Sequence, residues 1–77
     1  MEENYVQIFC TNLAHLMEAD KLTVNDMDFF IQEFSKVAAN IHSRQDLMGF
    51  LKGFPEYPEL QPLIDQLSDS NYQFKFN

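Results

Sequence analysis

The chain has 77 residues, and its 12 Asp and Glu residues against 5 Lys and Arg give a formal net charge of −7. A chain of this length forms one domain and buries only about 60–65% of its unfolded surface, which leaves little room for a deep substrate pocket with a complete catalytic site. The basic residues stand singly along the sequence, whereas binding to nucleic acid or to an anionic membrane surface needs them clustered. We therefore expect no enzyme, no direct nucleic-acid binding and no membrane binding.

The content of hydrophobic residues, 45%, and of aromatic residues, 14%, is typical of a folded domain rather than of a disordered acidic tail. Cys10 is the only cysteine, so an intrachain disulfide is excluded. Residues 1–20 lack the basic start and unbroken apolar run of a signal peptide, and no stretch reaches the roughly 18–20 apolar residues that span a bilayer. These features predict a cytoplasmic protein.

Two helices are expected in the first half of the chain. Over residues 3–20, apolar side chains recur at helical spacing and form one broad face. A second helix over residues 23–41 begins with Thr23 as its cap and Asp26 three residues later, which predicts a capping box. The apolar stripe of this helix, expected to face the core, comprises Val24, Met27, Phe30, Ile31, Phe34, Val37, Ala38 and Ile41.

Two shorter helices follow. Ser43 and Asp46 predict a second capping box at the start of a helix over residues 43–54, which Pro55 ends. Gly49 and Gly53 fall on its outer side, where each costs about 1 kcal/mol relative to Ala; either the helix frays at its end or another backbone approaches closely. After a connector braced by prolines, the spacing of the leucines and Ile64 predicts a fourth helix over residues 58–68.

The residues that could carry chemistry do not form a recognisable site. Cys10 lies on an apolar helix face, which favours packing over nucleophilic catalysis. His15 and His42 have no partner nearby in the sequence that is arranged for acid or base work, and an EF-hand loop starting at Asp26 lacks its required ligands and glycine. We expect no catalytic residues, no cofactor and no metal.

Phe29 is the first candidate contact for a partner. On the wheel of the second predicted helix it points away from the apolar stripe and lies beside Asp26 and Glu33. A large aromatic side chain among charges on a capped helix is typical of a binding hot spot. The alternative is that the Phe29 ring packs against another part of the chain.

The C-terminal tail, residues 69–77, is the second candidate. Tyr72, Phe74 and Phe76 alternate with polar residues, a pattern typical of a strand, but the rest of the chain offers no strand to pair with. The tail either folds back over the helices, adds a strand to the sheet of a partner, or exchanges between two copies of the chain.

Together these patterns predict an all-α fold: a single helical domain spanning residues 1–77, built as a compact bundle of four short helices with an aromatic C-terminal tail. We expect a small acidic adaptor or regulator that binds a protein partner, one with a basic surface, by stoichiometric contact. A homodimer is a further expectation. The alternative function is an inhibitor of the type found in phages or mobile elements, which would block the basic nucleic-acid groove of a host enzyme by acidic mimicry.

Overall fold

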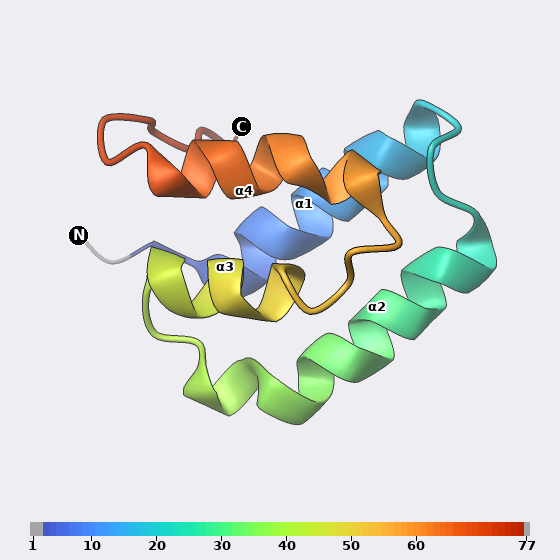
Figure 1. Cartoon of the computed structure of the whole chain (residues 1–77), viewed down its shortest axis with the longest axis horizontal. Helices are drawn as coiled ribbons and strands as arrows, with labels where there is room; N and C mark the ends of the chain where they lie inside the picture. The colour runs from blue at the N-terminus through green and yellow to red at the C-terminus, as the bar shows by residue number, and fades with distance from the viewer. Residues whose placement is uncertain (1–2, 77) are drawn as a thin grey trace.

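The computed structural model describes residues 3–76, and within this range it contains helices, two short 3-10 turns and no strand. The predicted all-α bundle of four short helices is therefore confirmed (Figure 1). The helices are α1 (Tyr5–Glu18), α2 (Val24–Val37), α3 (Arg44–Leu51) and α4 (Gln61–Ser68), with 3-10 turns at Ala38–Asn40 and Pro58–Leu60. Of the pairs of helices, α3 and α4 make the most extensive contact.

The start of α2 has the predicted chemistry. The Thr23 hydroxyl accepts a hydrogen bond from the Asp26 backbone N–H at 3.1 Å, and the Asp26 carboxylate accepts one from the Thr23 N–H at 3.0 Å. Both halves of the capping box are thus formed, which satisfies two backbone donors that a helix start leaves unpaired.

The capping box predicted for α3 forms only in part. The Ser43 hydroxyl accepts from the Asp46 N–H at 3.1 Å, but the Asp46 carboxylate accepts from the N–H of His42, one residue before the cap, at 2.9 Å. This arrangement fixes the chain that enters α3 as well as its first turn. At the start of α1, Asn4 is a further cap, which was not predicted: its side chain accepts from the Gln7 N–H at 3.0 Å.

The helix ends differ from the predicted boundaries. The α1 helix ends at Glu18 and is closed by Asp20, whose φ of 60° lies in the left-handed region. The N–H groups of Asp20 and Lys21 then donate to carbonyls of the last turn, the pattern of a Schellman motif. The second predicted helix, 23–41, stays α-helical only to Val37 and tightens into a 3-10 turn, because the chain must leave the helix to enter the cap of α3.

The predicted helix over residues 43–54 ends at Leu51 and continues as a turn over Lys52 and Gly53; Pro55 disfavours helical backbone at Phe54. Gly53 donates to the Phe50 carbonyl at 3.1 Å as the helix unwinds. A Cβ at Gly49 would meet nothing within 4 Å, so no other backbone approaches this glycine closely. The first part of the range predicted for the fourth helix, 58–68, is a 3-10 turn, and its α-helical part starts at Gln61.

The core lies between all four helices and is rich in leucine and phenylalanine. The Phe9 ring of α1 stacks on Phe34 of α2, with centroids 4.5 Å apart, and Phe50 of α3 packs edge-on against both rings. The buried residues are Ile8, Phe9, Leu13, Leu22, Phe30, Phe34, Leu47, Leu51, Leu60, Leu63 and Leu67. Two residues of the predicted apolar stripe, Val24 and Ile31, are instead exposed, so their placement in the core was wrong.

Candidate functional site

Phe29 is exposed on the outer side of α2, as the helical wheel predicts, with 42% of its surface accessible. Its ring packs edge-on against Phe30 at 5.5 Å and against Phe54, beyond the end of α3, at 5.8 Å between centroids. The Phe54 ring in turn packs on Phe30 and on Phe50. The exposed edge of Phe29 is therefore the outermost part of an aromatic cluster that reaches into the core.

The acidic neighbours of Phe29 have different surroundings. Asp26 accepts hydrogen bonds from Thr23 and from the hydroxyl of Tyr57 at 3.1 Å. The backbone and side-chain hydrogen bonds of Thr23, and then that of Tyr57, lower the pKa of Asp26, so this carboxyl stays ionised well below neutral pH. The bond to Asp26 also raises the pKa of Tyr57. Glu33 pairs with Lys36 one turn along the helix, at 2.7 Å.

We call the exposed ring of Phe29 with its neighbours Asp26, Glu33 and Phe54 the Phe29 surface. The spacing of Asp26, Phe29 and Glu33 at i, i+3 and i+7 places them in one row along α2. The three residues on α2 were expected from the sequence, whereas Phe54 and Tyr57 were not. No local pattern could have found them, because they join α2 only through the fold.

The tail folds back on its own helices. In Figure 1 it turns at the end of α4 and returns behind that helix. Phe74 and Phe76 are half-buried and pack against the core, whereas Tyr72 is exposed and contacts the Phe74 ring edge-on at 4.9 Å. The strand pattern of residues 72–76 does not give a strand, because the described chain has no sheet edge to pair with. Of the three alternatives given for the tail, the structure has the one in which the tail folds back over the helices.

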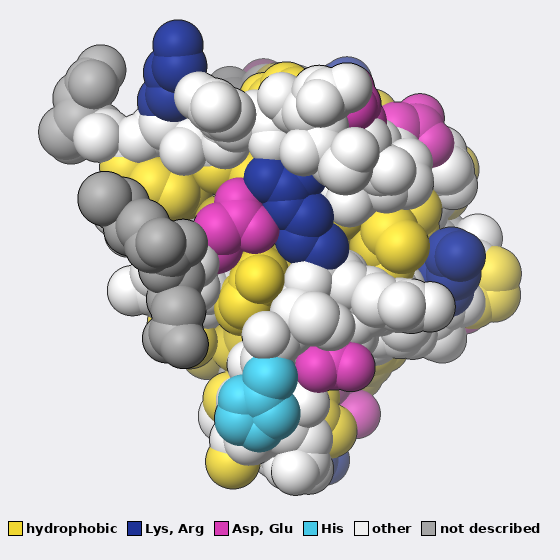
Figure 2. All heavy atoms as spheres, turned by 90° about the vertical axis from the view of Figure 1, so that its left-hand side faces the viewer, with side chains coloured by type: hydrophobic (Ala, Val, Ile, Leu, Met, Phe, Trp, Pro, Cys, Tyr) yellow, Lys and Arg dark blue, Asp and Glu magenta, His cyan; other side chains and the backbone are white. Residues whose placement is uncertain are grey.

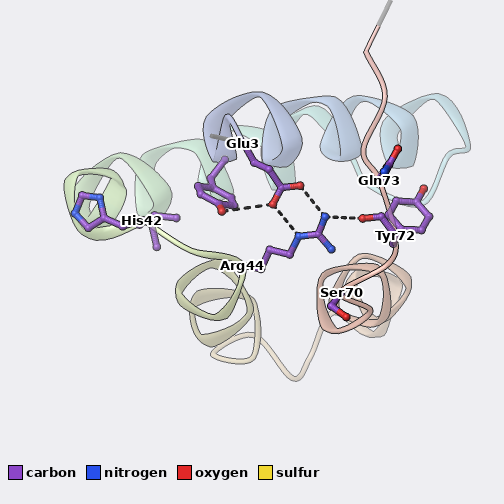
Figure 3. A pocket seen from close by; sticks show the side chains of 8 residues that line it. Glu3, His42, Arg44, Ser70, Tyr72 and Gln73 are labelled. Carbon is purple, nitrogen blue, oxygen red and sulfur yellow. Dashed lines mark hydrogen bonds and ion pairs between the residues drawn. The ribbon is translucent and has the colours of Figure 1, made fainter. Parts of the chain in front are cut away.

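Arg44, at the start of α3, holds both ends of the described chain together, an arrangement that we call the Arg44 clamp. Its guanidinium donates twice to the Glu3 carboxylate, at 2.7 Å each, and to the backbone carbonyls of Asp69 and Tyr72. Its positive charge also lies 5.2 Å from the centre of the Phe74 ring. Figure 3 shows Arg44 reaching between Glu3 and Tyr72.

A cleft of about 650 Å³ opens beside the Arg44 clamp and is lined by Glu3, Tyr5, His42 and Tyr72 among others. Side chains of opposite charge meet at the centre of this face of the molecule (Figure 2). The cleft brings a histidine and a carboxylate to one place, but the Glu3 carboxylate is bonded to Arg44, and the His42 ring points away from it (Figure 3). The bonds from Arg44 also lower the pKa of Glu3. This arrangement positions the tail and does not prepare Glu3 for proton transfer.

A third surface lies on the other side of α2 from Phe29. Val24 and Ile31 are exposed and lie seven residues apart on one face of α2. Val6 of α1 is also exposed and borders a shallow cleft with Ala38. We call the exposed side chains of Val6, Val24 and Ile31 on these two helices the α1–α2 face. Asp28 lies between Val24 and Ile31 on this side of α2, and Glu3 lines the cleft beside Val6. The homodimer itself stays a prediction.

Within residues 3–76, no helix combines the length and apolar character needed to cross a membrane. In the same range, no three His, Cys, Asp or Glu side chains are grouped as a metal site requires. Comparison with known protein families, with curated proteins and with solved structures gave no significant match.

Proposed function

We propose that this protein is a small protein-binding module, an adaptor or regulator that acts by stoichiometric contact through the Phe29 surface. The observation that supports the proposal most is the placement of the Phe29 ring. The ring is 42% exposed and makes two edge-on aromatic contacts. These contacts restrict it before binding, so a partner that buries it would cause little further loss of side-chain entropy. Rigid aromatic side chains of this kind dominate the energetics of many interfaces.

The structure gives less support to the alternative function, acidic mimicry of nucleic acid. A mimic needs carboxylates in rows that a basic groove can read as phosphates. Several acids here instead serve the fold: Glu3 is bonded to Arg44, Asp26 to Thr23 and Tyr57, and Asp46 to the chain entering α3. We therefore keep the Phe29 surface as the proposal and use salt to separate the two functions.

The test compares Phe29→Ala with Ile31→Ala. Ile31 is a matched control, because it is 41% exposed on another face of the same helix. Each variant is immobilised, and the proteins that it retains from the native host are quantified by mass spectrometry against the wild type. The partner's affinity should fall about 30-fold or more for Phe29→Ala, the loss expected of a hot spot, and stay unchanged for Ile31→Ala.

Equal retention by wild type and Phe29→Ala would refute the proposal, provided that circular dichroism shows the variant folded. The dependence of binding on ionic strength distinguishes the proposed function from acidic mimicry of nucleic acid. Binding through a phosphate mimic should weaken steeply between about 50 and 500 mM salt, because exposed charges are screened over a few ångströms at the higher concentration. Binding centred on Phe29 should change by only a few fold over the same range.

A further inference from the structure

A shallow groove of about 360 Å³ lies next to the Phe29 surface, between the end of α3, the connector that follows it and the start of α4. Buried Leu51 and Leu60 line it together with the half-buried side chains of Phe54, Tyr57 and Ile64. We call it the connector groove. Its lining is mainly apolar, as is usual for a site that receives a side chain of a partner.

The connector groove is fixed in shape by the chain that forms it. Pro55 and Pro58 restrict the backbone, and the N–H groups of Tyr57 and Leu60 donate to carbonyls three residues earlier, at 3.0 and 3.1 Å. The hydroxyl of Tyr57 is also tied to α2 through Asp26. The groove is therefore preformed and does not have to be opened by a ligand.

Two residues make the connector groove and the Phe29 surface continuous. Phe54 lines the groove and also touches the Phe29 ring, and Tyr57 lines the groove and bonds to Asp26. The combined surface offers two apolar contact points, the connector groove and the Phe29 ring, and the Phe54 ring belongs to both. Three acidic residues act on Tyr57: Asp26, which is bonded to its hydroxyl, and Glu56 and Glu59, whose negative charges help to raise its pKa. Glu33 lies one turn beyond Phe29 and is paired with Lys36. Lys52 is the basic residue that lines the groove.

From this geometry we infer that the site binds a basic amphipathic helix of a partner protein, with one apolar side chain in the connector groove and a second against Phe29. Apolar side chains three or four residues apart lie on one face of a helix, so two of them can reach neighbouring contact points on a partner. Lysine and arginine on the flanks of the helix complement the carboxylates of Asp26, Glu56 and Glu59. A second copy of this chain is disfavoured here, because its basic residues stand singly along the sequence and offer no cluster to meet these carboxylates. The inference rests on the proposed function and specifies the partner.

The test uses the full chain and a fluorescein-labelled peptide of about 18 residues, with leucines at helical spacing and lysines between them. A peptide of the same composition in scrambled order is the control. Fluorescence anisotropy gives affinities, and ¹⁵N-HSQC spectra show which backbone amides shift on binding. We expect the ordered peptide to bind at least about tenfold more tightly than the scrambled one, with the largest shifts at Phe29, Phe54, Tyr57 and Ile64.

Variants locate the binding site. Lys52→Gln removes a like charge from the groove and should tighten binding about two- to fivefold, and Glu59→Gln should weaken it by a similar factor. Ile64→Glu places a charge in the groove and should abolish binding, whereas Ile31→Glu on the α1–α2 face should not alter it. If Ile64→Glu does not fold, the two charge-neutralising variants decide the outcome.

Equal binding of the ordered and scrambled peptides would overturn the inference, as would shifts centred outside the groove or affinities insensitive to Lys52 and Glu59. These failures differ from failure of the proposed function. If Phe29→Ala loses the native partner while Ile64→Glu and Lys52→Gln retain it unchanged, the protein is a Phe29-dependent module that does not use the connector groove.

Discussion

Replacement of Arg44 by methionine should loosen both ends of the chain. The side chain of Arg44 is only 20% exposed and makes four hydrogen bonds and one ring contact. Its partly exposed ion pair with Glu3 contributes about 1 kcal/mol, at the upper end for such pairs. The two bonds to carbonyls and the contact with Phe74 add about 1–2 kcal/mol more.

The Arg44→Met variant should therefore lose about 2–3 kcal/mol of unfolding free energy, which lowers the melting temperature of a domain of this size by roughly 10–20 °C. Urea denaturation and calorimetry measure the two quantities. Backbone ¹⁵N relaxation should also show the amides of residues 73–76 becoming more mobile. Arg44→Lys keeps the charge but loses the bidentate hydrogen bond to Glu3. Its stability should therefore lie between that of the wild type and that of Arg44→Met.

Lys36→Met is the matched control, because it removes an ion pair whose lysine is 69% exposed. Its cost should stay below about 0.5 kcal/mol. If Arg44→Met costs no more unfolding free energy than Lys36→Met, the Arg44 clamp does not hold the tail. Unchanged relaxation in residues 73–76 would lead to the same conclusion.

The contribution of the Arg44 clamp also depends on pH in a known direction. Arg44 lowers the pKa of folded Glu3 below its ordinary value of 4.5. The pair therefore stabilises the protein fully above that value, and the stabilisation is lost as the pH falls through the lowered pKa. The difference in stability between wild type and Arg44→Met should be constant near neutral pH and shrink in acid. A difference that grows in acid would contradict this linkage.

Two further predictions use positions outside the proposed site. Gly49→Ala should stabilise the protein by about 0.5–1 kcal/mol, because Gly49 is in α3 and a new Cβ there meets nothing within 4 Å. Urea denaturation measures the change, and a lower unfolding free energy would show that the position needs glycine. If the chain dimerises through the α1–α2 face, Ile31→Lys should shift sedimentation equilibrium toward monomer, whereas Phe29→Ala should not; the reverse result would move self-association to the Phe29 surface.

The parts of the fold that could be predicted are those governed by local chemistry. Thr23 and Asp26 are three residues apart, so the sequence alone predicts their capping box, and the structure contains both bonds. The wheel of α2 likewise places Phe29 outside, because a helix fixes the direction of its side chains. The cap at Asn4 could also have been predicted, because Asn is a preferred N-cap residue and stands just before an apolar run.

The parts that could not be predicted depend on distant contacts. The wheel places Ile31 on the apolar stripe of α2, but it cannot show that α1 leaves that flank of the helix uncovered. The Arg44 clamp joins residues 41, 25 and 28 positions apart, and no pattern along the chain relates Arg44 to Glu3, Asp69 or Tyr72. The connector groove exists only because Phe54 and Tyr57 return to α2 after the end of α3.

The net charge of −7 therefore overstates the charge that a partner meets. Glu3 and Asp26 are engaged within the chain, and the charge of Glu33 is partly offset by Lys36. A partner drawn to the Phe29 surface meets a modest acidic border around a rigid ring. Modest charge guides orientation and association rate, whereas burial of an aromatic ring supplies affinity. Loss of the Phe29 ring should consequently act mainly on the dissociation rate, and loss of Glu59 mainly on the association rate.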